Sequence, residues 1–267
     1  MSDPAPVQLL DPFERVTFTA MDLLLKHGLP VTEVWLRTIG ASWMTLGSKN
    51  MMIPLGLERL EGLKFEDGIL LVSNHRSFFD LYMLTLLLHR HTVLRQPVLC
   101  PVRADFFYQR WPGVLVNLII GGGRMFPPFF REASKADFNK WALQRVVDEL
   151  HKGKVLVGYH PEGTRNKNAD PYEPLPAQPG VGKLVMDTWP IVVPAFIQGL
   201  SNNIVADVAG NFRGTKQVVA VFGEPIDLTP FRAYGNRLSS HKRIADALLK
   251  TIYQLGQEER AWRARQP

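Results

Sequence analysis

Apolar and polar positions follow two different periods along the chain from about residue 68 onward. Continuous apolar runs between turn residues are typical of buried strands, and apolar positions roughly three or four residues apart are typical of helices. Strands are predicted at residues 68–73, 98–102, 155–159, 191–197 and 217–222. Helices are predicted at residues 77–90, 132–152 and 239–262. Because strands alternate with helices, we expect an α/β fold with a mixed, mostly parallel sheet flanked by helices.

Local signals set the ends of one of these helices. Ser134 can cap the helix at 132–152 by accepting a bond from a backbone amide of its first turn. Gly153 can end it, because glycine readily adopts the left-handed conformation of a C-terminal cap.

The pattern of apolar residues in 8–60 differs from that of the later chain and predicts an amphipathic helical hairpin that precedes the sheet. Gly28-Leu29-Pro30 separates the two helices, and Thr32 can cap the second. Its large apolar side chains are Phe13, Val16, Met21, Leu24, Leu25, Val34, Leu36, Ile39, Trp43, Met44 and Leu46. The pattern fits equally a hairpin packed on its own protein and one in a membrane interface. We therefore divide the chain into a helical segment at 1–60, a possible membrane-docking hairpin, and a second domain at 61–267.

Composition is that of a globular protein, with 46% apolar residues. The single cysteine, Cys100, has apolar flanks that favour a buried structural thiol over a reactive one. The N-terminus lacks the basic start and apolar run of a secretory signal. The longest uncharged stretch, 188–206, holds two prolines and two asparagines, which predicts strand and loop. Any membrane contact is therefore expected to be peripheral.

The net charge of +6 favours anionic partners, which include nucleic acid, anionic lipid headgroups and phosphorylated substrates. The basic residues do not cluster with aromatic residues in a recognisable nucleic-acid-binding module. We therefore expect no nucleic-acid partner.

The first candidate chemistry lies in the segment 74–80, Asn-His-Arg-Ser-Phe-Phe-Asp. His75 follows a predicted strand, and the carboxyl ends of strands are where open α/β sheets bind ligands. Asn74 or Ser77 can cap the helix that carries Asp80. The Asp80 carboxylate can fix one ring nitrogen of His75 and leave the other free to accept a proton. This spacing alone arises easily by chance.

A second candidate follows the strand at 155–159, in the segment His160-Pro161-Glu162-Gly163-Thr164-Arg165. Pro161 ends the strand ladder, and Gly163 allows a tight turn and close approach of a ligand. Alone, the segment reads as a turn with a surface ion pair.

Other catalytic motifs are absent from the sequence. It contains no Gly-x-Ser-x-Gly elbow, no Walker loop and no Gly-x-Gly-x-x-Gly. Its histidines are too dispersed along the chain for a convincing zinc site. We expect neither a metal nor a bound cofactor.

The two segments together resemble the glycerophospholipid acyltransferase family, which includes the lysophosphatidic acid acyltransferases. That family carries an Asn-His-x-Ser-x-x-Asp block followed by a Pro-Glu-Gly-Thr-Arg block, as at 74–80 and 161–165. The segment 192–197, a strand interrupted by Pro194, is similar to its fourth block, and 222–226 to the strand end that follows. The resemblance covers residues 68 to 230.

Departures from the family pattern concern the acceptor-binding blocks. Arg103-Ala104-Asp105 stands where the family has Lys-x-Glu, and arginine and lysine do not bind phosphate identically. The second block offers two arginines, Arg124 and Arg131, neither in register. His160 replaces the usual phenylalanine, and Asn166 the usual serine.

The resemblance implies acyl transfer from a thioester to an alcohol, with His75 as general base and Asp80 as its orienting carboxylate. The acceptor implied is a lysoglycerophospholipid, foremost 1-acyl-glycerol-3-phosphate, and the donor is acyl-CoA or acyl carrier protein. The residues expected to bind substrate are Arg103, Arg124, Arg131, Glu162, Gly163, Thr164, Arg165 and Pro194. Backbone amides near Gly163 are candidate donors to the oxyanion.

Lipid substrates imply a location at a membrane. The basic balance suits an anionic surface, and the segment 8–60 looks similar to the docking helices of some family members. We therefore expect a peripheral protein on the cytoplasmic face.

Three alternatives remain open. The acceptor could be another lysolipid, such as a lysophosphatidylcholine or a lyso-aminolipid. The segments 180–184 and 198–203 look somewhat like transacylases of the family, which exchange chains between phospholipids. The chain could also be an inactive membrane-binding module of the same fold, although the intact blocks argue against this.

Overall fold

A six-stranded sheet forms the centre of the computed structural model, which describes residues 4–27, 34, 38 and 40–266. The strand order is β1-β8-β7-β2-β6-β3. Only β7 and β8 pair antiparallel within this sheet, so the mixed, mostly parallel sheet is confirmed. The strands are β1 (Met52–Leu55), β2 (Gly68–Ser73), β3 (Val98–Leu99), β6 (Val155–Tyr159), β7 (Ile191–Gln198) and β8 (Val218–Phe222). A separate pair joins β4 (Val102–Arg103) to β5 (Pro128–Phe129).

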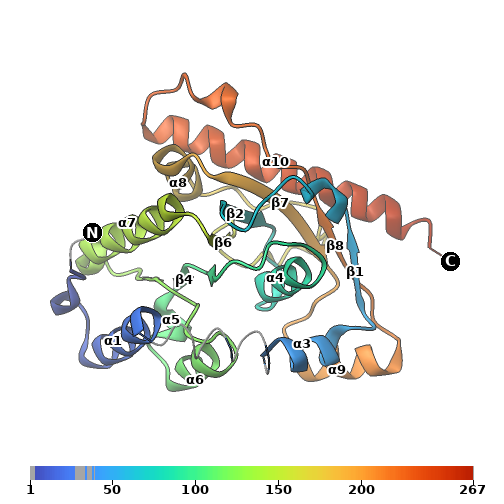
Figure 1. Cartoon of the computed structure of the whole chain (residues 1–267), viewed down its shortest axis with the longest axis horizontal. Coiled ribbons are helices and arrows are strands. Elements are labelled where there is room, and N and C mark those ends of the chain that lie inside the picture. Colours follow the sequence, from blue (N-terminus) through green and yellow to red (C-terminus); the bar gives the residue numbers. More distant parts are fainter. Residues whose placement is uncertain (1–3, 28–33, 35–37, 39, 267) are drawn as a thin grey trace.

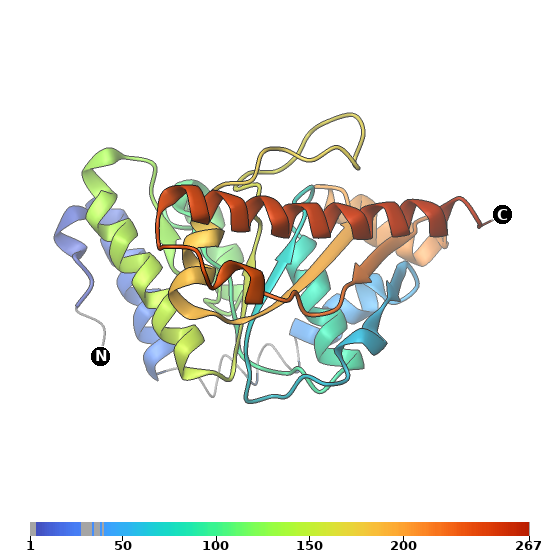
Figure 2. The same ribbon diagram turned by 90° about the horizontal axis from the view of Figure 1, so that it is seen from above.

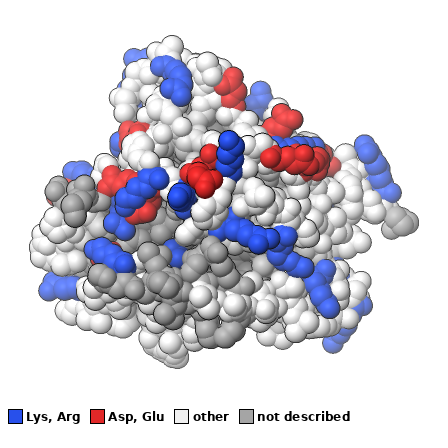
Figure 3. Space-filling model, viewed as in Figure 1, with Lys and Arg blue, Asp and Glu red and all other residues white. Residues whose placement is uncertain are grey.

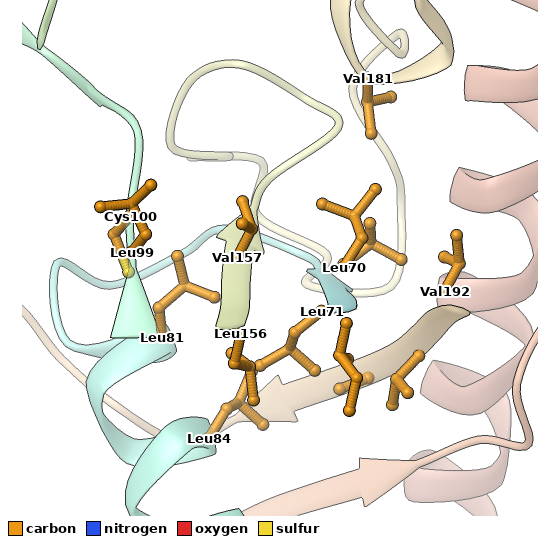
Figure 4. Close-up of a cluster of buried hydrophobic side chains, with 14 of the residues drawn as sticks. Leu70, Leu71, Leu81, Leu84, Leu99, Cys100, Leu156, Val157, Val181 and Val192 are labelled. Carbon is orange, nitrogen blue, oxygen red and sulfur yellow. The ribbon is translucent and has the colours of Figure 1, made fainter. Parts of the chain in front are cut away.

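Helices cover both faces of the sheet (Figure 1). One face carries α7 (Ala136–Lys152), α8 (Gly180–Thr188) and α10 (Leu238–Arg263), and the other carries α4 (Asp80–His91). Successive strand residues point to opposite faces, so Leu70 lies toward Val181 of α8 while Leu156 lies toward Leu84 of α4 (Figure 4). These four side chains are fully buried, which makes the sheet the core of the molecule.

Five further helices gather along the lower edge of the molecule in Figure 1. They are α1 (Pro12–His27), α3 (Ala41–Ser48), α5 (Ala104–Phe107), α6 (Trp111–Ile119) and α9 (Ile204–Arg213). Short 3-10 turns lie at Val7–Leu9, Leu57–Leu60, Ala133–Lys135 and Thr229–Phe231. Figure 2 shows α10 crossing the molecule and the loop 160–179 projecting behind it. Among the described residues, no helix is both long and apolar enough to cross a bilayer.

The strands and long helices lie close to their predicted positions, with three local corrections. The strand predicted at 98–102 is two short strands in different sheets, β3 and β4. Ser134 does not cap α7: it lies within a 3-10 turn, and no side chain caps the helix. Neither Asn74 nor Ser77 caps α4, whose N-cap is Phe79 without a side-chain bond. Gly153 does end α7, at a φ of 70°.

The N-terminal segment is less purely helical than predicted. Its residues 52–55 form β1, hydrogen-bonded in parallel to β8 at the edge of the sheet, so the helical prediction is wrong there. The predicted break at 28–30 and the cap at Thr32 lie outside the described residues. The boundary at residue 60 stays a prediction.

Helix α1 packs one face against its own protein. Phe18 and Met21 are fully buried, and the Phe18 ring contacts those of Phe126 and Phe138. The ammonium of Lys135, in the turn before α7, lies 2.7 Å from the Glu14 carboxylate. The inward face of α1 is therefore part of the core.

Candidate active site

The first site loop begins where β2 ends. Asn74 is fully buried, and its side-chain amide both donates to the carbonyl and accepts from the amide of Ile197 on β7. These two hydrogen bonds fix the start of the loop to the neighbouring strand. The residue that precedes His75 is therefore held in a fixed position at the end of β2.

His75 and Asp80 form the pair that the sequence predicted. Nδ1 of His75 lies 3.2 Å from Oδ2 of Asp80. Since an ionised carboxylate only accepts, Nδ1 carries the hydrogen and Nε2 has the free lone pair. The same Oδ2 accepts the backbone amides of Arg76 and Ser77, each at 2.7 Å. The carboxylate thus shapes the loop and orients the ring at once.

Burial sets the protonation of this pair. Desolvation lowers the pKa of His75 to about 4, and the positive charge of Arg165 lowers it further in the same direction. Desolvation raises the pKa of Asp80 to about 6, against the lowering effect of its backbone donors. At neutral pH the imidazole is therefore neutral and the carboxylate ionised, which is the state a general base requires.

The second site loop follows β6 and places His160 directly against His75. The two rings stack with centroids 3.8 Å apart and planes 9° from parallel. Nδ1 of His160 lies 3.1 Å from the carbonyl of Ser73, so this nitrogen donates. Desolvation by burial lowers the pKa of His160 to about 3, which keeps the supporting ring neutral. The sequence marked His160 only as a departure from the family.

Glu162 holds the first loop through a hydrogen bond to the backbone amide of His75. Its carboxylate is 1% exposed and accepts from the Tyr253 hydroxyl at 3.0 Å, the Leu175 amide at 3.2 Å and the His75 amide at 3.4 Å. Burial raises its pKa. With three protein donors and almost no exposed surface, the carboxylate is placed to hold the loop that carries His75.

Gly163 makes the turn after Glu162 with a φ of +67°, as the sequence expected of a glycine there. Its amide donates to the carbonyl of His160 at 3.0 Å. That amide is engaged within the turn, so the expectation of an oxyanion donor at Gly163 itself finds no support in this geometry. Thr164 is exposed beside it.

The four arginines that were predicted to bind substrate lie in three different places. Arg165 is exposed, acts electrostatically on His75 and donates to the side chain of Asn202 at 2.9 Å. Arg103 and Arg131 are exposed and flank Asp105, at 3.7 and 3.3 Å. Arg124 is buried at 6% exposure and lines a cavity beside α4.

That cavity encloses about 290 Å³ and runs along α4. Its wall includes Leu81, the residue after Asp80, and continues to His89 near the end of the helix. Further apolar lining comes from Leu86, Cys100 and Met125. Burial raises the pKa of the Cys100 thiol to about 12, as fits the predicted structural thiol. Pro194 lies on β7 and is not among the lining residues.

Several supporting residues escaped the sequence analysis because their partners are distant in the chain. Asn166 donates its amide to the His75 carbonyl at 2.6 Å, and its side chain donates to the Tyr253 hydroxyl at 3.1 Å. The Ser77 hydroxyl donates to the Ser201 carbonyl. The only sequence signal was the position of Asn166 directly after the Pro-Glu-Gly-Thr-Arg block.

His75 and His160 are far apart in the sequence, and the fold brings them together. With Asp80, they offer ligand atoms within 4.8 Å of one another. Stacked parallel rings direct their lone pairs into separate planes, and Nδ1 of each ring is engaged in a hydrogen bond. This arrangement fits a hydrogen-bonded base better than a metal centre.

Comparison with known proteins identifies the family of the chain. The family model described as Acyltransferase matches residues 55–198, which include both site loops. Since the match covers more than half of the chain, the protein belongs to the acyltransferase family. Among solved structures, the chain is similar to the 1-acyl-sn-glycerophosphate (LPA) acyltransferase PlsC from Thermotoga maritima. The TM-score is 0.53 at 16% identity, over 96% of this chain and 98% of that chain. No curated protein sequence matches.

Proposed function

We propose that this acyltransferase moves a fatty acyl chain from an acyl thioester to the hydroxyl of a lysoglycerophospholipid, foremost 1-acyl-glycerol-3-phosphate. The observation that carries the proposal is the neutral imidazole of His75, held through Nδ1 by the ionised Asp80. Its Nε2 is the proton acceptor that acyl transfer to an alcohol needs.

The chemistry requires no covalent enzyme intermediate. As the acceptor oxygen attacks the thioester carbonyl, Nε2 of His75 takes the hydroxyl proton and a tetrahedral intermediate forms. Collapse of the intermediate breaks the carbon–sulfur bond, and His75 passes the proton to the leaving thiolate. Asp80 stabilises the transient imidazolium, and the buried loop holds the ring in place. The donor is acyl-CoA or an acyl carrier protein.

Arginines would bind the acceptor phosphate through charge-assisted hydrogen bonds. Arg165 is the first candidate because its charge already acts on His75. Arg103 and Arg131 are exposed at the end of β4 and just after β5, where a phosphate could compete with Asp105 for them. Glu162 contributes by positioning the loop, since its carboxylate is buried.

We assign the acyl chain to the cavity along α4. Its wall starts one residue after Asp80 and is largely apolar. An acyl chain bound there would have its carbonyl end toward the catalytic pair. Chain length would then depend on where the cavity closes near His89.

We further propose that the protein acts as a peripheral protein on the cytoplasmic face of an anionic membrane. The substrates reside in a bilayer, and the net charge of +6 favours anionic headgroups.

A second acceptor class is favoured by one observation. Arg103 and Arg131 share Asp105 as an ion-pair partner, which reduces the positive charge available to a phosphate monoester. A zwitterionic lysolipid, such as a lysophosphatidylcholine, would place less demand on these arginines.

Mass spectrometry of products from a panel of lysolipids with one acyl-CoA tests the proposal. We expect a diacyl product whose new chain comes from the thioester, with the fastest turnover on 1-acyl-glycerol-3-phosphate. A parallel reaction with diacyl phospholipid as donor tests transacylation. If the purified protein acylates no lysolipid from either donor, the proposal is wrong.

A further inference from the structure

Helix α6 exposes an apolar face that the catalytic site does not use. Its nine residues, Trp111–Ile119, include no charged side chain. Trp111, Leu115 and Ile119 are 68%, 44% and 55% exposed. Positions four residues apart lie on one side of a helix, and the opposite side buries Gly113 and Asn117. The helix therefore presents one apolar stripe to its surroundings.

Other helices along the same edge of the molecule also expose apolar side chains. Along the same edge in Figure 1, α1 exposes Val16 at 69%, and α9 exposes Val205 and Phe212 at 74% and 58%. No Asp or Glu of the described residues appears along the lower edge of Figure 3. Exposed cations stand at helix ends, with Arg110 as the N-cap of α6. Such a combination of apolar side chains and flanking cations is complementary to an anionic lipid surface.

An aromatic path connects α6 to the catalytic loop. A Cβ on Gly113 would lie 1.9 Å from the carbonyl oxygen of Phe106, so α6 packs backbone against backbone on α5. The rings of Phe106 and Phe107 lie 5.7 and 5.2 Å from that of Phe78. Phe78 is three residues after His75. The buried face of α6 thus packs on α5, and the rings of α5 contact Phe78 of the catalytic loop.

We propose that the stripe of Trp111, Leu115 and Ile119 docks the protein onto an anionic bilayer. This inference rests on the proposed function, because an acceptor that is a lipid is located in the bilayer. Docking through α6 would hold the catalytic loop, which contacts α5 through Phe78, close to the bilayer that carries the acceptor. Trp111 is suited to this position, because its indole combines an apolar body with a polar N–H.

The structure also makes α6 a better test than deletion of the N-terminus. Removing residues 1–55 would strip β1 from the sheet and uncover the core that Phe18 and Met21 fill. Loss of vesicle binding in that truncation would not distinguish docking from unfolding. Exchanging exposed side chains on α6 removes no strand and uncovers no core residue.

The test compares the pair W111S/L115S with the matched control Y234S/L238S. Tyr234 and Leu238 are 36% and 69% exposed and lie away from the lower edge, by α10. Sedimentation with phosphatidylglycerol–phosphatidylcholine vesicles should show about tenfold weaker binding for the α6 pair, given the apolar area it withdraws. The control should stay within about twofold of the unsubstituted protein. Should the α6 pair fail to fold, L115S/I119S on the same stripe replaces it.

Measurements of turnover distinguish a failure of this inference from a failure of the proposed function. W111S/L115S should keep its activity on a short-chain lysolipid offered as monomers, and lose activity on the same headgroup in vesicles. Unchanged vesicle binding by the α6 pair would overturn the docking surface, whatever the turnover. A change from dimer to monomer on size exclusion with vesicle binding retained would also overturn it, because the stripe would then bind a second copy. Failure of the proposed function would appear instead as an unsubstituted protein that binds vesicles but acylates nothing.

Discussion

The Asp80 carboxylate links the shape of the loop at residues 75–77 to the protonation of His75, the proposed base. Its three donors hold residues 75–77 around one oxygen, and burial raises its pKa to about 6. Protonation of Asp80 would remove the acceptor that holds Nδ1 of His75. The site should therefore lose its base at a pH well above the pKa of about 4 of the imidazole itself.

The pH profile of kcat/KM tests this coupling. We expect kcat/KM to be flat between about pH 7 and 8, and to fall as the pH drops through about 6, where Asp80 takes up a proton. The residual activity of D80N should lack this limb, because the amide does not titrate. A limb centred above pH 7 would contradict the account, since the imidazole would then be protonated at neutral pH.

The ring of His160 should matter more than its hydrogen bond. H160F keeps a flat ring against His75 but cannot donate to the Ser73 carbonyl, whereas H160N can donate but offers no ring. We expect H160F to retain most of kcat, and H160N to lose about tenfold or more because the base is free to tilt. Steady-state kinetics of the two variants decide between them. Equal kcat for H160N and the unsubstituted protein would show that the stack does not position His75.

At the scale of elements, α8 and α10 meet through a glycine. A Cβ on Gly182 would lie 1.9 Å from the backbone oxygen of His241, which cannot move without shifting α10. We expect G182A to lower the free energy of unfolding by about 1–3 kcal/mol, despite the better helix propensity of alanine. Denaturant titration measures this change. The control is G62A, where nothing lies within 4 Å of the new methyl group and a change below about 0.5 kcal/mol is expected. A G182A protein as stable as G62A would show that the crossing is looser than the structure has it.

The strongly periodic elements could be predicted from the sequence, and the ambiguous ones could not. Strands such as 155–159 and 191–197 are continuous apolar runs, and α7 and α10 have clear amphipathic periods. Strand β1 was missed because Pro54 argues against a strand, although proline is tolerated at a sheet edge. Helix α6 was missed because it lacks the polar side that gives a helical period. Which of its apolar side chains are exposed can be seen only from the packing of α6 on the rest of the protein.

At the scale of the whole molecule, the fold brings together residues that the sequence left apart. His75 and Asp80 could be predicted because their segment and the Pro161–Arg165 segment together resemble the motifs of one family, whereas the spacing of the pair alone would not have been enough. The stack with His160, 85 residues after His75, depends on β2 and β6 being neighbours in the sheet. The same pairing turns Glu162 from a predicted ligand of the acceptor into a buried support. Contacts between strand ends follow from sheet order, which periodicity does not encode.

The proposed membrane-docking surface likewise depends on the whole molecule. The sequence predicted a docking segment at residues 8–60, and exposed apolar side chains occur both there and on later helices such as α6 and α9. One face of α1, in the predicted docking segment, is part of the core through Phe18 and Met21. Only the assembled edge shows which side chains are left to face a bilayer.

The central claim is that His75 is the base of an acyl transfer, and the turnover of H75A tests it most directly. Diacyl product formation from acyl-CoA and 1-acyl-glycerol-3-phosphate should fall at least about a thousandfold in H75A, within the scale set by general-base catalysis and loss of the dyad. Circular dichroism and thermal unfolding should match the unsubstituted protein, because His75 is a partly exposed loop residue. An H75A protein that folds and forms diacyl product at the original rate would contradict the account.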